Sequence, residues 1–173
     1  MKKVAFLDRD GTINVDHSWV SNKDRWEWMP RAIEGLMELQ KDHELVVVTN
    51  QGGIAIGKYT EQDVIDLHKW MQDEAAVFGI KFAAVLYCPH DRNQTDCGCR
   101  KPGVGMARQA EKILGEIDYA NSVMIGDKMT DIAFGKTLGM KTVLIRSKYW
   151  NGEIGPDIIV DNLLEASLMI TWS

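Results

Sequence analysis

The strongest constraint on the fold is a series of short apolar runs that contain no alternating polar residues. Residues 4–7, 45–48, 83–86, 123–125 and 142–145 form such runs, and residues 158–160 form a weaker sixth. An uninterrupted apolar run is typical of a strand that is buried on both faces, and parallel sheets are the sheets that are usually covered on both sides. The sequence therefore predicts a sheet of parallel strands.

Helical patterns fill the intervals between these runs. Apolar residues recur at helical spacing over residues 32–39, 64–78, 106–114 and 132–138. Pro30 precedes the first pattern, Thr60 and Asp63 form a capping box before the second, and Gly115 and Gly139 follow the last two. Strands and helices that alternate in this way form right-handed βαβ units. We therefore expect an α/β fold, a doubly wound three-layer parallel sheet.

Length and composition limit the class of protein. The 173 residues suit one domain, which we expect to cover residues 1–173, and 45% hydrophobic with 26% charged residues is ordinary for a globular chain. No apolar run approaches the roughly 20 residues that span a bilayer, and the amino terminus has no secretory leader. We expect a cytoplasmic protein without a membrane partner. A net charge of −5 excludes broad binding to nucleic acid.

Two stretches interrupt the alternation of strands and helices. Residues 11–29 are polar and aromatic and include Trp19, Trp26 and Trp28, which predicts an ordered excursion over one face of the sheet. Residues 89–105 are loop-like. Both stretches follow predicted strand ends, and open α/β sheets bind ligands beyond the carboxyl ends of their strands.

The first strand runs into two carboxylates, Asp8 and Asp10, followed by Gly11 and Thr12. If the chain curls out of the extended form between them, both carboxylates reach one site. This arrangement suits an aspartate nucleophile with a neighbouring acid/base carboxylate, or a pair of metal ligands. A solvated turn is the alternative, because these residue types are common in turns.

Polar side chains also follow the second strand. Thr49, Asn50 and Gln51 offer a hydroxyl and two amides, and Gly52 and Gly53 let backbone N–H groups approach a ligand. Such groups can hold phosphate oxygens. The alternative is an ordinary loop between a strand and a helix.

The fourth strand is followed by Asp127 and Asp131, four residues apart. Carboxylate oxygens are the ligands that Mg²⁺ prefers. Asp131 has an alternative explanation, because an acid in the first turn of a helix complements the helix dipole. Whether Asp131 contributes to a metal site stays open at this point.

The three cysteines of the chain and one histidine cluster after the third strand. This set comprises Cys88, His90, Cys97 and Cys99. Three thiolates and an imidazole complete a tetrahedral structural zinc site, which we favour over a disulfide or free buried cysteines in a cytoplasmic chain. Zinc would pin this loop and fix the two cations that follow, Arg100 and Lys101, for binding phosphate.

In order along the chain, these motifs resemble those of haloacid dehalogenase (HAD) superfamily phosphatases. The matching residues are Asp8-x-Asp10-x-Thr12, Thr49, Lys101 and Gly126-Asp127-x-x-x-Asp131. The cysteine loop narrows the resemblance to a branch that contains the heptose bisphosphate 7-phosphatases and the histidinol-phosphate phosphatases. Residues 12–20, 53–58 and 126–128 are similar to the heptose enzymes, although the segment between His90 and Cys97 is short and Gly52 replaces a usual Ser. A zinc-stabilised binding module without catalysis is the alternative of a different class.

The resemblance implies a HAD-like Rossmannoid fold without a separate cap domain, and it implies a mechanism. Asp8 would form an aspartyl-phosphate, and Asp10 would act as general acid and then as general base. Mg²⁺ would be held by Asp8, Asp127 and the Asp10 carbonyl. Thr49 and Lys101 would hold the transferring oxygens.

The resemblance also implies a small sugar phosphate as the substrate. Arg100 would lie near it, together with the expected substrate-binding residues Asp16, His17, Ser18, Trp19, Asn50, Gln51, Gly52 and Lys128. Nothing in the sequence requires a second subunit, so we expect a monomer. Of the other histidines, we expect His43 to be solvated, and we expect His68 to lie within an amphipathic helix at the boundary between its buried and exposed faces.

Overall fold

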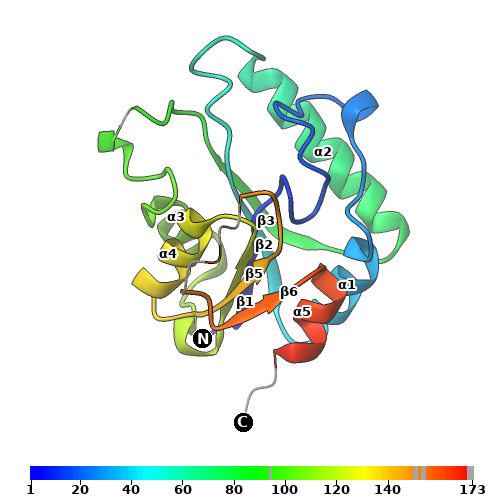
Figure 1. The fold of residues 1–173 in the computed structure, drawn as a ribbon, viewed down its shortest axis with the longest axis vertical. Helices are drawn as coiled ribbons and strands as arrows, with labels where there is room; N and C mark the ends of the chain where they lie inside the picture. The colour runs from blue at the N-terminus through cyan, green and yellow to red at the C-terminus, as the bar shows by residue number, and fades with distance from the viewer. Residues whose placement is uncertain (94, 150–151, 153–154, 171–173) are drawn as a thin grey trace.

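The computed structural model describes residues 1–93, 95–149, 152 and 155–170, so one residue of the predicted 89–105 loop lies outside the described part. Its strands form one parallel sheet in the order β3-β2-β1-β4-β5-β6 (Figure 1). The strands are β1 (Val4–Leu7), β2 (Glu44–Asn50), β3 (Phe82–Cys88), β4 (Val123–Gly126), β5 (Lys141–Ile145) and β6 (Ile158–Val160). Every predicted run is a strand, and the parallel sheet is confirmed.

Helices cover both faces of this sheet and complete the three layers. The helices are α1 (Ala32–Leu39), α2 (Glu61–Val77), α3 (Gly105–Leu114), α4 (Met129–Thr137) and α5 (Leu163–Met169). In Figure 1, α1, α2 and α5 lie on one side of the sheet, and α3 and α4 lie on the other. The sequence patterns did not predict α5, and α4 begins three residues before the predicted start.

Alternate residues of the central strand explain the uninterrupted apolar runs. Ala5 and Leu7 of β1 join the core beneath α1, α2 and α5, whereas Val4 and Phe6 join the core beneath α3 and α4. All four side chains are fully buried. A strand that is covered on both faces has no position that favours a polar residue.

The start of α2 follows the predicted capping box. Thr60 Oγ1 accepts a hydrogen bond from the Asp63 backbone N–H at 3.1 Å, and Asp63 Oδ2 accepts one from the Thr60 N–H at 2.7 Å. Two backbone donors that the helix leaves unpaired are thereby satisfied. The helix buries Leu67, His68 and Met71 against the rest of the molecule.

The excursion after β1 is ordered by its tryptophans. The ring of Trp26 contacts Trp28 and Trp70 edge-on, with centroids 5.2 and 5.8 Å away. Trp70 belongs to α2, so the excursion packs against that helix, as the aromatic composition predicted. Ser18 and Trp19 have positive φ angles of 56° and 55°, a conformation that non-glycine residues rarely adopt.

The prediction that His43 is solvated is wrong. The connection between α1 and β2 folds back so that His43 is buried, with 8% of its surface exposed. Burial lowers the pKa of His43, which keeps the imidazole neutral. None of the helices in the described part of the chain is long and apolar enough to cross a membrane.

The sheet order fixes where a ligand can bind. β1 is central, and the chain winds from it to β2 on one side and reaches β4 on the other. In such sheets the crevice at this reversal, beyond the carboxyl ends of the strands, is the ligand site. The acids after β1, the amides after β2 and the acids after β4 all lie at this edge.

Candidate active site and metal-binding cluster

A buried lysine bridges two acids at the carboxyl end of the sheet. Lys101 Nζ lies 2.8 Å from Asp8 Oδ1 and 2.6 Å from Asp131 Oδ1. Lys101 and Asp8 are 3% and 5% exposed. Burial alone would lower the pKa of Lys101, but Asp131 and Asp8 outweigh this effect and the pKa is raised. The structure therefore places a permanent cation beside Asp8.

The Asp127 carboxylate is buried, and Lys128 Nζ lies 3.9 Å from its Oδ1. Both oxygens are buried and receive no hydrogen bond from the described residues. Gly11 makes room for them, because a Cβ at this glycine would lie 2.4 Å from Asp127 Oδ2. Burial, followed by the neighbouring Asp8, raises the pKa of Asp127 to about 8. Burial also raises the pKa of Asp8, despite the contact with Lys101.

These acids fit a hard divalent cation. Oxygens of Asp8, Asp127 and Asp131 lie within 4.8 Å of one another. Two buried acids with raised pKa values ionise fully when a cation joins them, and Mg²⁺ is bound through one or two carboxylates. Asp8 and Asp127 are placed to supply such a pair.

The contacts of Asp131 give it a different role. Its Oδ1 contacts Lys101, and its Oδ2 accepts the backbone N–H of Lys128 at 3.0 Å at the start of α4. Gly126 allows this close approach, since a Cβ there would lie 2.3 Å from Asp131 Oδ2. Both oxygens are engaged, so Asp131 orients Lys101 and caps α4.

Donors from three residues surround the Asp10 carboxylate. Arg9 Nη2 donates to both of its oxygens at 3.0 and 2.9 Å, Asn14 Nδ2 donates at 3.0 Å, and Gln51 Nε2 donates at 3.0 Å. Burial raises the pKa of Asp10, but Arg9, Asn14 and Gln51 together outweigh burial and the pKa is lowered. Asp10 is therefore ionised and held in one orientation.

Arg9 was missed by sequence reasoning, although its charge between two acids was visible. It is completely buried. Its Nη2 donates to the Val20 carbonyl at 2.6 Å, and its Nη1 lies 3.1 Å from His68 Nε2. A guanidinium can only donate, so His68 Nε2 is the acceptor and the imidazole is neutral. Arg9 thus joins the first motif to α2.

Neutral His68 makes the free energy of unfolding depend on pH. Burial, followed by Arg9, lowers its pKa from 6.5 to about 3. Between these values the unfolded chain binds a proton that the folded chain does not bind. The stabilisation is fully present above about pH 6.5 and is lost progressively as the pH falls.

We therefore predict an effect of the substitution His68→Gln, which retains an acceptor for Arg9. The wild type loses about 2 kcal/mol more unfolding free energy than the variant between about pH 7 and about pH 5. Urea unfolding of both proteins at both pH values measures this difference. His17→Gln, at an exposed histidine, serves as the control, and equal losses in the wild type and His68→Gln would contradict the prediction.

The polar residues after β2 connect parts of the site. Gln51 Nε2 donates to Thr49 Oγ1 at 2.8 Å as well as to Asp10, and Tyr59 donates to Gln51 Oε1 at 2.7 Å. Asn50 bonds the backbone of Lys101 twice, donating to its carbonyl at 3.2 Å and accepting its N–H at 2.9 Å. The end of β2 thus holds both Asp10 and the loop that carries Lys101.

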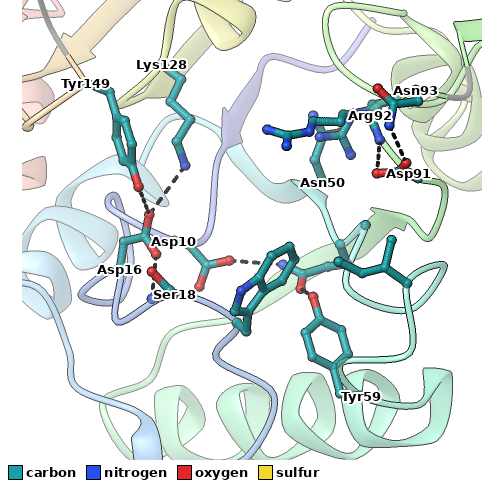
Figure 2. Close-up of a pocket in the computed structure, with 15 residues that line it drawn as sticks. Asp10, Asp16, Ser18, Asn50, Tyr59, Asp91, Arg92, Asn93, Lys128 and Tyr149 are labelled. Carbon is teal, nitrogen blue, oxygen red and sulfur yellow. Dashed lines mark hydrogen bonds and ion pairs between the residues drawn. The ribbon is translucent and has the colours of Figure 1, made fainter.

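A cavity of about 510 Å³ opens beside these residues (Figure 2). Eight predicted site residues line it besides Asp10: Asp16, Ser18, Trp19, Asn50, Gln51, Gly52, Arg100 and Lys128. Sequence reasoning missed Ile56, Tyr59, Asp91, Arg92, Asn93 and Tyr149, which also line it. The cavity is of the size that holds a small-molecule ligand.

The structure does not bring His17 to this cavity. His17 Nε2 pairs with Glu27 Oε2 at 2.7 Å and lines a second, separate hollow. The left-handed backbone at Ser18 and Trp19 turns the chain after His17. The structure thus places His17 outside the cavity, unlike the other residues that were predicted to bind the substrate.

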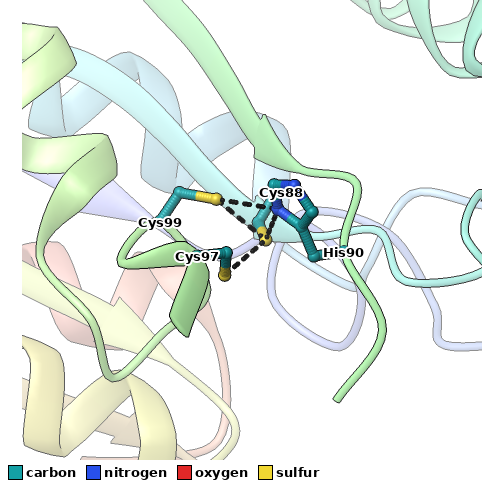
Figure 3. Close-up of side chains that lie close together, drawn as sticks. All are labelled: Cys88, His90, Cys97 and Cys99. Atoms are coloured by element: carbon teal, nitrogen blue, oxygen red, sulfur yellow. Dashed lines mark hydrogen bonds between the residues drawn. The ribbon is translucent and has the colours of Figure 1, made fainter. Parts of the chain in front are cut away.

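The cysteines and His90 converge in the loop after β3, as Figure 3 shows. The Sγ of Cys88 lies 3.9 Å from that of Cys97 and 3.1 Å from that of Cys99, and His90 Nδ1 lies 3.5 and 3.2 Å from Cys88 and Cys99 Sγ. Around tetrahedral zinc the ligand atoms are separated by about 3.5 to 3.8 Å. The donor set fits one zinc ion, and the separations of 3.1 to 3.9 Å lie on both sides of that range.

This cluster is adjacent to the cavity. Arg100, which follows Cys99, donates to the His90 carbonyl at 3.2 Å. It lies against Gly52, where a Cβ would be 3.2 Å from Arg100 Nη1 and 3.0 Å from the His90 carbonyl oxygen. A side chain at position 52 would therefore press on the arginine and on the backbone of the cluster.

The sheet is doubly wound, and a lysine paired with acids lies where its strand order reverses. These features define the class of the protein as a HAD-type hydrolase. A HAD-hydrolase-like family model matches residues 98–166. A D-glycero-β-D-manno-heptose-1,7-bisphosphate 7-phosphatase of Haemophilus ducreyi is 41% identical over 95% of this chain and 96% of its own. The Escherichia coli K12 protein of the same name is 43% identical over 82% of this chain and 78% of its own. The chain belongs to the D-glycero-β-D-manno-heptose-1,7-bisphosphate 7-phosphatase family.

A solved structure agrees with this assignment. The D,D-heptose 1,7-bisphosphate phosphatase of B. bronchiseptica, complexed with magnesium and phosphate, is 28% identical. It superposes with a TM-score of 0.86 over 96% of both chains.

Proposed function

We propose that this protein is a Mg²⁺-dependent phosphatase that removes the 7-phosphate of D-glycero-D-manno-heptose 1,7-bisphosphate through an aspartyl-phosphate. One observation carries the chemistry: Asp8 lies against buried Lys101 and beside Asp127, whose oxygens accept no hydrogen bond from the described residues. The names of the relatives that are 41% and 43% identical support the substrate.

Asp8 is the proposed nucleophile. Its Oδ1 is held by Lys101, which leaves Oδ2 to attack phosphorus as the bond to the sugar oxygen breaks. Lys101 then lies where it can neutralise the transferring oxygens, and the Thr49 hydroxyl, whose oxygen already accepts from Gln51, retains its proton to donate to them. When bound by Asp8, Asp127 and the Asp10 carbonyl, Mg²⁺ supplies further charge neutralisation at the phosphoryl group.

Asp10 is the proposed proton donor and acceptor. The anionic phosphate favours the protonated form of the nearby carboxyl. Asp10 then gives its proton to the departing sugar oxygen. In the second step it takes a proton from the water that attacks phosphorus, and the bond between Asp8 and phosphorus breaks.

The cavity supports a doubly phosphorylated ligand. Its lining includes the cations Arg92 and Arg100 together with Lys128, which is paired with Asp16. The carboxylates of Asp10 and Asp91 also line the cavity. Arg92 and Arg100 can contact phosphate oxygens beyond the reacting phosphate, although the chain has a net charge of −5.

We predict that kcat/KM with Mg²⁺ is at least about 100-fold higher on the heptose bisphosphate than on histidinol phosphate. Histidinol phosphate lacks the second phosphate and the sugar hydroxyls, so it would leave polar side chains of the cavity without a hydrogen-bond partner, which is costly. Initial rates of phosphate release on both compounds measure the ratio. A preference for histidinol phosphate would overturn the assigned substrate while leaving the chemistry of Asp8 intact.

We further propose that zinc occupies the site formed by Cys88, His90, Cys97 and Cys99, and that the protein acts as a monomeric single domain. The described strands form one sheet, which supports a single folding unit. The cysteines are unpaired thiols, which suits a reducing compartment, and we assign the protein to the cytoplasm.

A further inference from the structure

The loop after β5 contributes a wall of the cavity to which the proposed mechanism gives no role. Tyr149 lines the cavity and its hydroxyl donates to Asp16 Oδ2 at 3.1 Å. The ammonium of Lys128 lies 4.6 Å from the centre of the Tyr149 ring. Figure 2 shows the three side chains grouped on one side of the cavity, opposite Arg92 and Asn93.

The loop is attached to the turn that carries the metal-site acid. Ser147 Oγ donates to the backbone carbonyl of Asp127 at 3.1 Å and accepts the backbone N–H of Tyr149 at the same distance. Tyr149 is therefore held at a fixed place relative to Lys128, the next residue after Asp127. Tyr149 is 43% exposed, so it lines the cavity without being part of the core.

The contacts of Asp16 determine what this wall can bind. Lys128 Nζ lies 3.5 Å from Asp16 Oδ2, and the backbone N–H of Ser18 donates to Asp16 Oδ1 at 3.0 Å. With the Tyr149 hydroxyl, both oxygens of Asp16 are oriented, and Lys128 compensates the negative charge. Such a carboxylate can still accept hydrogen bonds from hydroxyl groups, but it has little net charge with which to attract an ammonium group.

We infer that Tyr149 is a positioning residue for specificity: it holds Lys128 against Asp16, so that this wall selects leaving groups with neutral hydroxyls over leaving groups with an ammonium group. The inference rests on the proposed phosphatase function and adds a basis for its choice of substrate. The ring holds the cation through its π face, and the hydroxyl holds the carboxylate.

The test is the ratio of kcat/KM on a polyol phosphate to kcat/KM on an amino-alcohol phosphate. Heptose bisphosphate and histidinol phosphate form one pair, and glycerol 3-phosphate and phosphoethanolamine form a second pair that does not depend on the heptose. Tyr149→Leu lowers both ratios by about tenfold, and Tyr149→Phe, which keeps the ring, lowers them by less. Tyr87→Phe is the matched control, since its hydroxyl contacts Glu61 at 2.8 Å outside the cavity.

A double variant separates positioning from direct contact. If Tyr149 acts through Lys128, Lys128→Met combined with Tyr149→Leu has the ratio of Lys128→Met alone. Unchanged ratios in Tyr149→Leu would overturn the inference, and independent, multiplying losses in the double variant would overturn the positioning role. A wild type that leaves the heptose bisphosphate uncleaved would contradict the proposed function, and the second substrate pair would still decide the role of Tyr149.

Discussion

Replacing Asp8 by Asn lowers kcat by about 10⁴-fold or more, because an amide cannot form the aspartyl-phosphate. The substitution keeps the size of the side chain and leaves an oxygen that can accept from Lys101. It also removes one of several acids buried together, so we expect the folded state to survive. The measurement is single-turnover phosphate release with Mg²⁺ present.

The matched control is Asp66→Asn on the exposed face of α2, where Asp66 accepts a hydrogen bond from Gln62. It should retain wild-type turnover. Mass spectrometry of acid-quenched wild type should find a phosphoryl group on the peptide that contains Asp8. Phosphate release by Asp8→Asn at the wild-type rate would rule out the covalent mechanism and would limit the role of Asp8 to binding.

Loss of zinc has the second largest expected effect, and it acts on stability as well as on activity. Cys97→Ala or His90→Ala removes one of the four proposed zinc ligands, and we expect the free energy of unfolding to fall by roughly 4 kcal/mol and the Tm by about 10 °C. kcat/KM falls too, because the loop that ends in Arg100 and Lys101 is no longer pinned.

Metal analysis of the purified proteins measures the zinc content, and melting curves of the same samples measure the change in Tm. The wild type should contain one zinc ion per chain, and both variants should lack it. His17→Ala is the control, since that imidazole pairs with Glu27 away from the cluster. A fully folded wild type without bound zinc would contradict the structural site.

The sequence predicted the sheet because the strands at its centre, β1 and β4, are buried at every position and carry no polar side chain. Val4–Leu7 and Ile158–Val160 match the predicted runs at both ends. Helix α5 was not predicted because its seven residues are too few to show a clear helical period of apolar residues. His43 was misjudged since a polar connection gives no sign that the chain will fold back over it.

The strand-end acids were visible in the sequence, whereas their partners were not. Asp8, Asp127 and the cysteines stand in motifs with characteristic spacing. Arg9 acquires its role only when α2 brings His68 to within 3.1 Å, 59 residues away in the chain. Tyr149 reaches Asp16 across 133 residues. Contacts of this kind depend on how the layers pack, which no local pattern records.

The same long separations decide when during folding the site comes into existence. Asp8 and Lys101 are 93 residues apart, and Asp16 and Lys128 are 112 residues apart. Closing such loops is slow, and it is rewarded only once the intervening strands have docked. A chain in which one strand has not yet docked lacks Lys101, the acids Asp8 and Asp127, or the cavity wall that contains Asp16 and Lys128. Phosphatase activity should therefore return, after dilution from denaturant, at the rate of the last docking step. Partly folded chains should have no activity.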